Sequence, residues 1–415
     1  MAIVRPFKGF RPLPKYAAQV AARPYDVLSS EEARREALSN PLSFLHVSKP
    51  EIDLALDVHP YDERVYQKGK DNLQKLIADG VISEDTSPCF YLYALTFGNH
   101  RQVGIVACAS VEEYLQSKIK KHELTRKDKE DDRAKHVKIT AAHSGPVFLA
   151  YREQAFLDSL VASVCLTPPE NDFVTDDGVR HQVWIVNDEE AIVQIANAFG
   201  DVESLYIADG HHRAAAAARV ASELKDSNPN HTGSESYNYF LAVLFPQNQL
   251  RIMDYNRVLC DLNDLTEQEF TQEVLKVFTF EKAPGDTKPS KKGELKMMLA
   301  GNWYDLVIRP ELVAHLDLIE RLDVSLLQNC FLKPILGIDD PRTSKRIDFI
   351  GGIRGLNEIE RRVKSSEMAV GFALYPTSMD ELLAVADAGM IMPPKSTWFE
   401  PKLRDGLVIH FFTTS

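Results

Sequence analysis

The sequence has few cysteines and no paired cysteine motif. Its five cysteines are scattered along the chain: Cys89, Cys108, Cys165, Cys260 and Cys330. Isolated cysteines in odd number offer neither a disulfide framework nor a thiolate metal site, and they are typical of a reducing compartment. The segment from Met1 to Lys8 also lacks the basic start and apolar core of a signal peptide. We therefore expect a cytoplasmic protein.

Long apolar runs and an excess of positive charge are also missing. No stretch approaches the roughly 18 apolar residues of a membrane helix, and the longest apolar segments, such as 239–245, are typical of buried strands. Lys and Arg number 48 against 60 Asp and Glu, which gives a net charge of −12. An acidic surface repels a phosphate backbone, so we expect neither a membrane nor nucleic acid as partner.

Three common catalytic motifs are absent. The chain has no G-x-x-x-x-G-K-[ST] loop and no G-x-S-x-G elbow. His122-Glu123 is not a zincin motif, because Arg126 stands where the second histidine is needed. The sequence therefore lacks the motifs that define the P-loop NTPases, the α/β-hydrolases and the zincins.

The 415 residues predict two or three folded units at about 150 residues per domain. The fold class expected is α+β, a mixed α/β protein, with an N-terminal region over 1–260 and a C-terminal α/β region over 261–415. Strand and helix patterns alternate through the last third, which favours a parallel or mixed sheet there. The densely charged run 116–138 predicts a solvated helix face. Further strands are expected over 90–97, 103–109, 147–151, 204–208 and 240–245. Further helices are expected over 65–77, 189–199 and 213–225.

The strongest local signal is the segment Asp209-Gly210-His211-His212-Arg213, between an apolar strand and an alanine-rich helix. A glycine turn into a helix presents free backbone N–H groups, which favour an anion. Arg213 offers a fork that matches phosphate, and the histidines can donate or shuttle a proton. Asp209 is suited to holding Mg²⁺, a substrate amine or a histidine. The alternative interpretation is structural, with Asp209 capping the helix and the histidines lining its first turn.

Two further clusters carry chemical potential. Glu123, in the charged run, can act as a general base towards a hydroxyl, although an exposed helix segment is the simpler interpretation. Lys395-Ser396-Thr397 follows two prolines and offers one ammonium and two hydroxyls for phosphate, or forms a plain turn. Arg213, Lys395 and Lys402 are candidates for a small positive pocket in this acidic protein. Asn256-Arg257 either extends such a lining or forms a surface ion pair.

Three motifs in this order carry a resemblance to known families: His122-Glu123, then Asp209 to Arg213, then Pro394-Lys395-Ser396-Thr397. At the second motif the chain looks like the ParB/sulfiredoxin-like superfamily, in which a Gly-x-x-Arg turn holds nucleotide phosphates. More closely, it resembles the free serine kinases of archaeal type (SerK-like) and the large bacterial family often labelled "DUF ten-fifteen". The match to that family extends over nearly the whole chain, including Pro24-Tyr25-Asp26-Val27 and Phe399-Glu400-Pro401-Lys402.

The resemblance implies a ParB/sulfiredoxin-like nucleotide-binding core with large insertions, and a C-terminal α/β unit that contributes a phosphate-binding turn. It also implies a nucleotide- and Mg-dependent kinase that uses ATP or ADP to phosphorylate a free hydroxyl amino acid such as L-serine. By that similarity Glu123 is the catalytic base, with His212 beside it among the catalytic residues. The substrate and phosphate site would hold the remaining candidates: Asp209, Gly210, His211, Arg213, Lys395, Ser396, Thr397 and Lys402.

Two other functions stay open at this point. A non-catalytic nucleotide-binding switch of ParB type needs the same phosphate turn but no base. A metal-dependent hydrolase built on His211 and His212 would need a tightly held ion. Adjacent helical residues diverge by about 100°, so this pair alone is a poor chelator.

Overall fold

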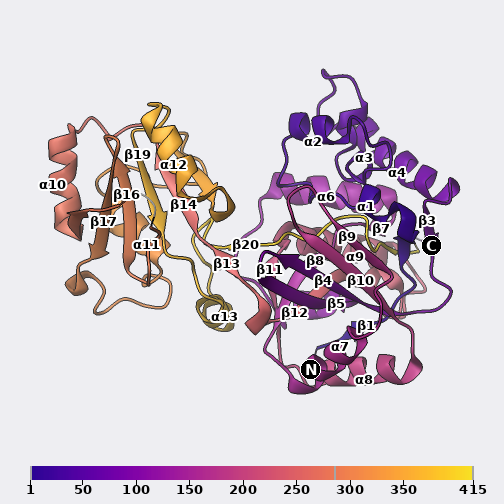
Figure 1. Cartoon of the computed structure of the whole chain (residues 1–415). Helices are drawn as coiled ribbons and strands as arrows, with labels where there is room; N and C mark the ends of the chain where they lie inside the picture. The colour runs from indigo at the N-terminus through magenta and orange to yellow at the C-terminus, as the bar shows by residue number, and fades with distance from the viewer. Residues whose placement is uncertain (1, 285–286, 414–415) are drawn as a thin grey trace. The chain divides into compact units, whose positions relative to one another are not determined.

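The computed structural model describes residues 2–284 and 287–413. It contains two compact units of mixed α/β structure (Figure 1). The first unit comprises Met1–Leu250 together with Pro401–Ser415, and the second comprises Arg251–Glu400. The end of the chain therefore belongs to the same unit as its beginning.

A nine-stranded mixed sheet forms the centre of the first unit, in the order β6-β11-β8-β12-β5-β4-β10-β9, with β1 beside β5. The pairs β6–β11 and β8–β12 are parallel, and the remaining pairs are antiparallel. Strands β8 and β12 are buried at every position, and β5 is buried from Gln102 onward, as expected for strands covered on both faces. The strands span Val4–Arg5 (β1), Phe90–Phe97 (β4), His100–Ser110 (β5), Ile119–Lys120 (β6), Val147–Tyr151 (β8), Asn171–Val174 (β9), Arg180–Val186 (β10), Leu205–Asp209 (β11) and Tyr239–Pro246 (β12).

Helix α9 (His211–Ser227) provides much of the core against this sheet. Its residues Ala214 to Ala218 are all buried, because small side chains let the helix approach the strands closely. The same core takes apolar side chains from four other helices: α5 (Val111–Leu115), α6 (Lys127–Thr140), α7 (Ala155–Val164) and α8 (Glu189–Gly200).

A separate apolar cluster lies in the N-terminal part of the first unit. Ser29 caps its helix α2 with a capping box to Glu32. Two short strand pairs also lie in this unit, and one of them joins β21 near the chain end to β7. The elements are α1 (Ala17–Val20), α2 (Ser30–Ala37), α3 (Leu45–Ser48), α4 (Glu63–Ala78), β2 (Phe10–Pro12) with β3 (Ile82–Glu84), and β7 (Ala142–His143) with β21 (His410–Phe411).

The charged run 116–138 is not one helix, and this prediction is wrong. Its first part contains β6 and a loop, and α6 begins only at Lys127. The helix that does form is not solvated on every face either, because Asp132 and His136 are both less than a tenth exposed. The Tyr66 hydroxyl donates a 3.0 Å hydrogen bond to Asp132. Periodicity of apolar residues cannot reveal a buried face of this kind.

The second unit contains a six-stranded sheet in the order β15-β17-β16-β19-β14-β18. Every pair in it is antiparallel, so the expected parallel or mixed sheet is wrong. Its strands are β14 (Tyr255–Leu259), β15 (Phe278–Lys282), β16 (Glu294–Leu299), β17 (Asn302–Ile308), β18 (Ile347–Gly351) and β19 (Val370–Leu374). Its helices are α10 (Glu267–Val277), α11 (Asp323–Leu327), α12 (Gly355–Lys364) and α13 (Met379–Asp387), and β13 (Ile252–Met253) pairs with β20 (Trp398–Phe399).

In the described ranges, no helix is both long enough and apolar enough to cross a bilayer.

Candidate functional site

Parallel pairing of β6 and β11 brings two distant segments of the first unit together. Ile119 lies opposite Leu205, and Lys120 lies opposite Tyr206. Parallel neighbours end at the same edge of a sheet, so the loop after β6 and the turn after β11 emerge side by side. His122-Glu123 belongs to that loop, and the segment from Asp209 to Arg213 forms that turn.

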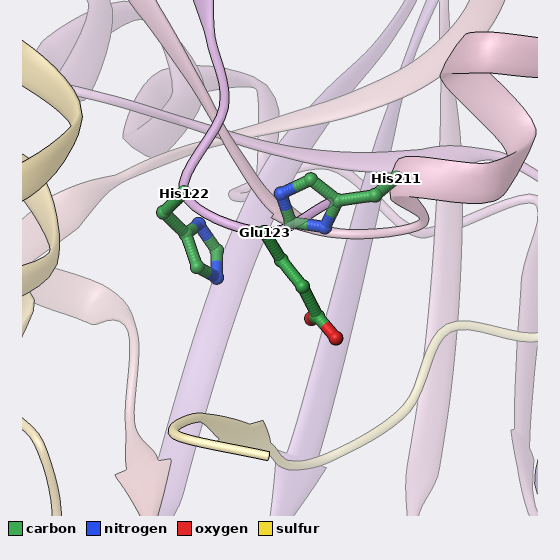
Figure 2. Close-up of side chains that lie close together, drawn as sticks. All are labelled: His122, Glu123 and His211. Atoms are coloured by element: carbon green, nitrogen blue, oxygen red, sulfur yellow. The ribbon is translucent and has the colours of Figure 1, made fainter. Parts of the chain in front are cut away.

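The side chains of His122, Glu123 and His211 converge at this edge (Figure 2). One ligand atom from each lies within 4.8 Å of the other two. The two imidazole rings meet edge to face, with their centroids 4.5 Å apart and an interplanar angle of 87°. The structure therefore places Glu123, the base expected from the sequence, directly beside the first residue of α9.

Both histidines of this cluster are buried. Burial lowers the pKa of His122 to about 4, although a backbone hydrogen bond with Ile207 and the charge of Asp209 act in the opposite direction. Burial also lowers the pKa of His211 well below its ordinary value. His211 is 6% exposed, and its Nε2 has no hydrogen-bond partner among the residues that the structure describes. Both rings are therefore neutral at pH 7, and His211 keeps an unused nitrogen.

Asp209 forms an ion pair and does not cap α9. Its Oδ2 accepts a 2.7 Å hydrogen bond from Lys402 Nζ, and its Oδ1 accepts one of 2.8 Å from the Gly210 N–H. Burial would raise the pKa of Asp209, but Lys402 and the Gly210 amide lower it to about 2. No side-chain cap is found on α9 in the described structure. The interpretation in which Asp209 caps α9 is therefore wrong.

Gly210 opens α9 in the left-handed region, with φ of 90°. A Cβ at this position would meet its nearest neighbour, Val147 Cα, at 3.5 Å, which is ordinary contact. Gly210→Ala is therefore expected to destabilise the first unit by about 1–2 kcal/mol through backbone strain alone. Gly200→Ala is the control, because a Cβ there meets nothing within 4 Å and its φ is not positive. Equal midpoints for the two variants in urea unfolding would contradict this.

Arg213 is engaged by a buried carboxylate. Its Nη1 and Nη2 donate to the two Asp405 oxygens at 3.0 and 3.2 Å, and Nη1 also donates to the Pro146 carbonyl at 3.2 Å. Gly145 makes room for the pair, since a Cβ there would lie 2.2 Å from Arg213 Nη1. The guanidinium also lies 5.5 Å from the centre of the Tyr25 ring, beside a cavity of about 30 Å³. Any phosphate at Arg213 would share it with Asp405.

His212 has a fixed tautomer when neutral. Its Nε2 accepts a 3.0 Å hydrogen bond from the Arg126 N–H, so the proton lies on Nδ1. Its partner Arg126 comes from the same loop that carries Glu123. His212 is therefore positioned by the loop, although it is not one of the three converging residues.

Lys395, Ser396 and Thr397 lie in the second unit, between α13 and β20. Lys395 adopts a left-handed backbone with φ of 59°. The buried Ser396 hydroxyl donates to the Pro393 carbonyl at 2.6 Å, and the Thr377 hydroxyl donates to the Ser396 carbonyl at 3.0 Å. The segment is thus a hydrogen-bonded turn.

The surface ion pair expected for Arg257 is wrong. Arg257 is 4% exposed, and it donates to the backbone carbonyls of Tyr255 and Lys395. Burial lowers its pKa to about 10. Sequence reasoning also missed Asp405 as the partner of Arg213, because no spacing or motif connects two residues so far apart.

Fold and site together define a mixed α/β protein in which a carboxylate and two histidines meet at an uncapped helix N-terminus. The sequence matches the family described as "protein of unknown function (DUF1015)" over residues 4–325. The chain belongs to this family, as the sequence motifs predict.

Among solved structures, the chain is similar to a conserved hypothetical protein from Pyrococcus furiosus, with 11% identity, a TM-score of 0.35, and coverage of 73% of this chain and 93% of that one. It is also similar to a variant of a free serine kinase in complex with AMP, at 11% identity, a TM-score of 0.36 and coverage of 73% and 92%. The chain is similar as well to SbnI with a C-terminal truncation from Staphylococcus aureus, at 13% identity and a TM-score of 0.36. That match covers 72% of this chain and 85% of that one. No curated protein matches the sequence significantly.

Proposed function

We propose that this protein is a nucleotide- and Mg-dependent kinase that phosphorylates a small hydroxyl compound, with a free amino acid such as L-serine as acceptor. One observation carries the proposal: the Glu123 carboxylate lies beside the N-terminus of α9, with ligand atoms within 4.8 Å of His211. In this proposal a base for a hydroxyl and a site for phosphate oxygens would share one edge of the sheet. The core around them would be of the ParB/sulfiredoxin-like type.

In this proposal Glu123 accepts the proton of the acceptor hydroxyl. The hydroxyl oxygen forms a bond to the terminal phosphorus of the nucleotide, while the bond from that phosphorus to the leaving nucleotide breaks. In this proposal the backbone N–H groups and the dipole at the start of α9, which no side chain caps in the described residues, favour the phosphate oxygens. His212, held by the Arg126 N–H, would supply or relay a proton at the same edge. Catalysis of this kind depends mainly on alignment and electrostatics.

The residues present offer two carboxylates that suit Mg²⁺, which prefers oxygen ligands. Asp209 already accepts hydrogen bonds from Lys402 and Gly210, but a carboxylate has lone pairs left for an ion. ATP or ADP would bring further oxygens through its phosphates. Lys402 and Arg213, both in the first unit, would balance the phosphate charge. The turn Lys395 to Thr397 belongs to the second unit and stays a separate candidate for phosphate binding.

The test is direct. The pure protein, incubated with ATP or ADP, Mg²⁺ and L-serine, is expected to form O-phosphoserine, followed by mass spectrometry. Glu123→Gln should lower kcat by about 100- to 10,000-fold, because the amide cannot take up the proton. Glu190→Gln is the matched control, since Glu190 is exposed on α8 and bonds Gln194.

Absence of product with either nucleotide, or equal rates in wild type and Glu123→Gln, would overturn the proposal. Saturable nucleotide binding without any phosphorylated product would instead support the ParB-type switch. Nucleotide binding is measured separately by calorimetry, so the two outcomes are distinguishable.

A further inference from the structure

The cluster of His122, Glu123 and His211 has a second chemical capacity, independent of phosphoryl transfer. Two imidazoles and one carboxylate form the donor set of many transition-metal sites, including zinc sites with three protein ligands and one open position. The ligand atoms lie within 4.8 Å of one another. Mg²⁺ makes little use of imidazole, so this donor set suits a different ion from the one that accompanies a nucleotide.

The second observation is the state of His211. Its side chain is buried, and its Nε2 has no hydrogen-bond partner within residues 2–284 and 287–413. A buried polar atom without a partner costs about 1–3 kcal/mol, and such atoms call for an explanation in a water, an ion or a function. A metal ion at the centre of the cluster would supply the missing partner.

The surroundings of His122 point in the same direction. His122 forms a hydrogen bond with the backbone of Ile207, in the strand that leads to the turn. A metal-binding histidine commonly uses its second ring nitrogen for a carbonyl of this kind, which fixes the ring. The His211 ring stands edge to face with that of His122 at 4.5 Å, and a ligand nitrogen of each ring lies within 4.8 Å of the other.

The required adjustment is small. Ligand atoms around a tetrahedral ion at about 2.1 Å lie about 3.4 Å apart, so the present spacing of up to 4.8 Å must close by about 1.4 Å. Glu123 is half-buried on a loop, and its side chain has three rotatable bonds. Rotation of Glu123 can bring its carboxylate closer to the two histidines, and small χ changes of the two rings would supply the rest of the movement.

We infer that His122, Glu123 and His211 form a binding site for a divalent transition-metal ion of the Zn²⁺ class. The inference goes beyond the proposed kinase function and does not depend on it. An ion at this site would occupy Glu123, so it would compete with the role of Glu123 as a base.

The experiment measures metal binding without nucleotide. Chelator-treated protein is titrated with Co²⁺, followed by its visible absorption band, and then with Zn²⁺ by calorimetry. Wild type is expected to bind one ion per chain, and Zn²⁺ is expected to displace Co²⁺. His211→Gln and Glu123→Gln should each weaken Zn²⁺ binding by at least about 100-fold, since loss of supporting groups alone costs 10- to 100-fold.

His212→Gln is the discriminating control, because His212 is adjacent in sequence but outside the cluster. It should retain the affinity of wild type, whereas a site built on His211 and His212 would lose it. Circular dichroism of the metal-free proteins checks folding, and Glu123→Gln serves if the buried His211→Gln does not fold. Failure of wild type to bind an ion, or equal binding by Glu123→Gln and wild type, overturns the inference. Kinase assays on chelated protein with added Mg²⁺ keep the two proposals separate.

Discussion

Asp405→Ala is expected to lower the free energy of unfolding of the first unit by about 3–5 kcal/mol, because it leaves a buried guanidinium without its counter-ion. Asp405 is 2% exposed and accepts both hydrogen bonds from the Arg213 fork. Burial raises the pKa of Asp405 to about 6, and Arg213 offsets only part of that effect, so the carboxylate is ionised at pH 7.5. The substitution also weakens the attachment of residues 401–413 to the rest of the first unit.

The measurement is urea unfolding at pH 7.5, followed by fluorescence of the buried Trp184 after Trp303→Phe and Trp398→Phe remove the signals of the second unit. Asp172→Ala is the matched control. It breaks the ion pair with Arg180 on the surface, where side-chain exposures are 34% and 51%. Such a pair contributes about 0–1 kcal/mol. If both variants lose the same free energy of unfolding, the buried pair of Arg213 and Asp405 contributes no more to stability than a surface ion pair.

Local chemistry explains what the sequence could reveal about the site. The apolar strand, the single glycine and the alanine-rich helix occur at β11, Gly210 and α9 because each depends on neighbouring residues alone. The left-handed backbone at Gly210 is the kind of feature that only glycine adopts easily. This short segment is also one of the three motifs that carry the family resemblance.

Long-range pairing explains what the sequence could not reveal. Strand β6 has only two residues, and its role is to run parallel to β11. The two residues Ile119–Lys120 carry no pattern that predicts this pairing. The pairing nevertheless brings Glu123 close to α9. The same holds for Lys402 and Asp405, whose partners Asp209 and Arg213 lie far away in the chain. Ion pairs across such distances depend on the fold rather than on spacing.

In the second unit the predicted alternation of strands and helices is present, but the sheet topology predicted from it is wrong. Strands β18 and β19 run in the same direction with α12 between them in the chain, as a strand–helix–strand pattern suggests. However, β14 lies between them and is antiparallel to both. Helical crossovers fix the direction of the two strands they join, but the choice of their neighbour depends on tertiary packing.

Acidification from pH 6.5 to pH 4 is expected to destabilise the first unit strongly, because several of its histidines are buried in neutral form. Burial lowers the pKa of His136 and His410 to about 4 and that of His181 to about 3. The unfolded chain takes up protons near pH 6.5, while the folded chain does not. Stability is therefore full above pH 6.5 and is lost as the pH falls toward 4, on the order of 2–3 kcal/mol for each histidine.

His136→Gln tests this expectation one proton at a time. His136 Nε2 lies 2.8 Å from the Val47 carbonyl, and a glutamine amide can donate to the same oxygen without titrating. Urea unfolding followed by Trp184 fluorescence should show a smaller loss of stability between pH 6.5 and 4 in His136→Gln than in wild type. The slope of the unfolding free energy against pH should fall by up to the equivalent of one proton. Asn230→Ala, an exposed substitution that removes no titratable group, should keep the slope of wild type. An unchanged slope in His136→Gln would mean that His136 does not resist protonation in the folded protein, and that acid sensitivity arises from other groups.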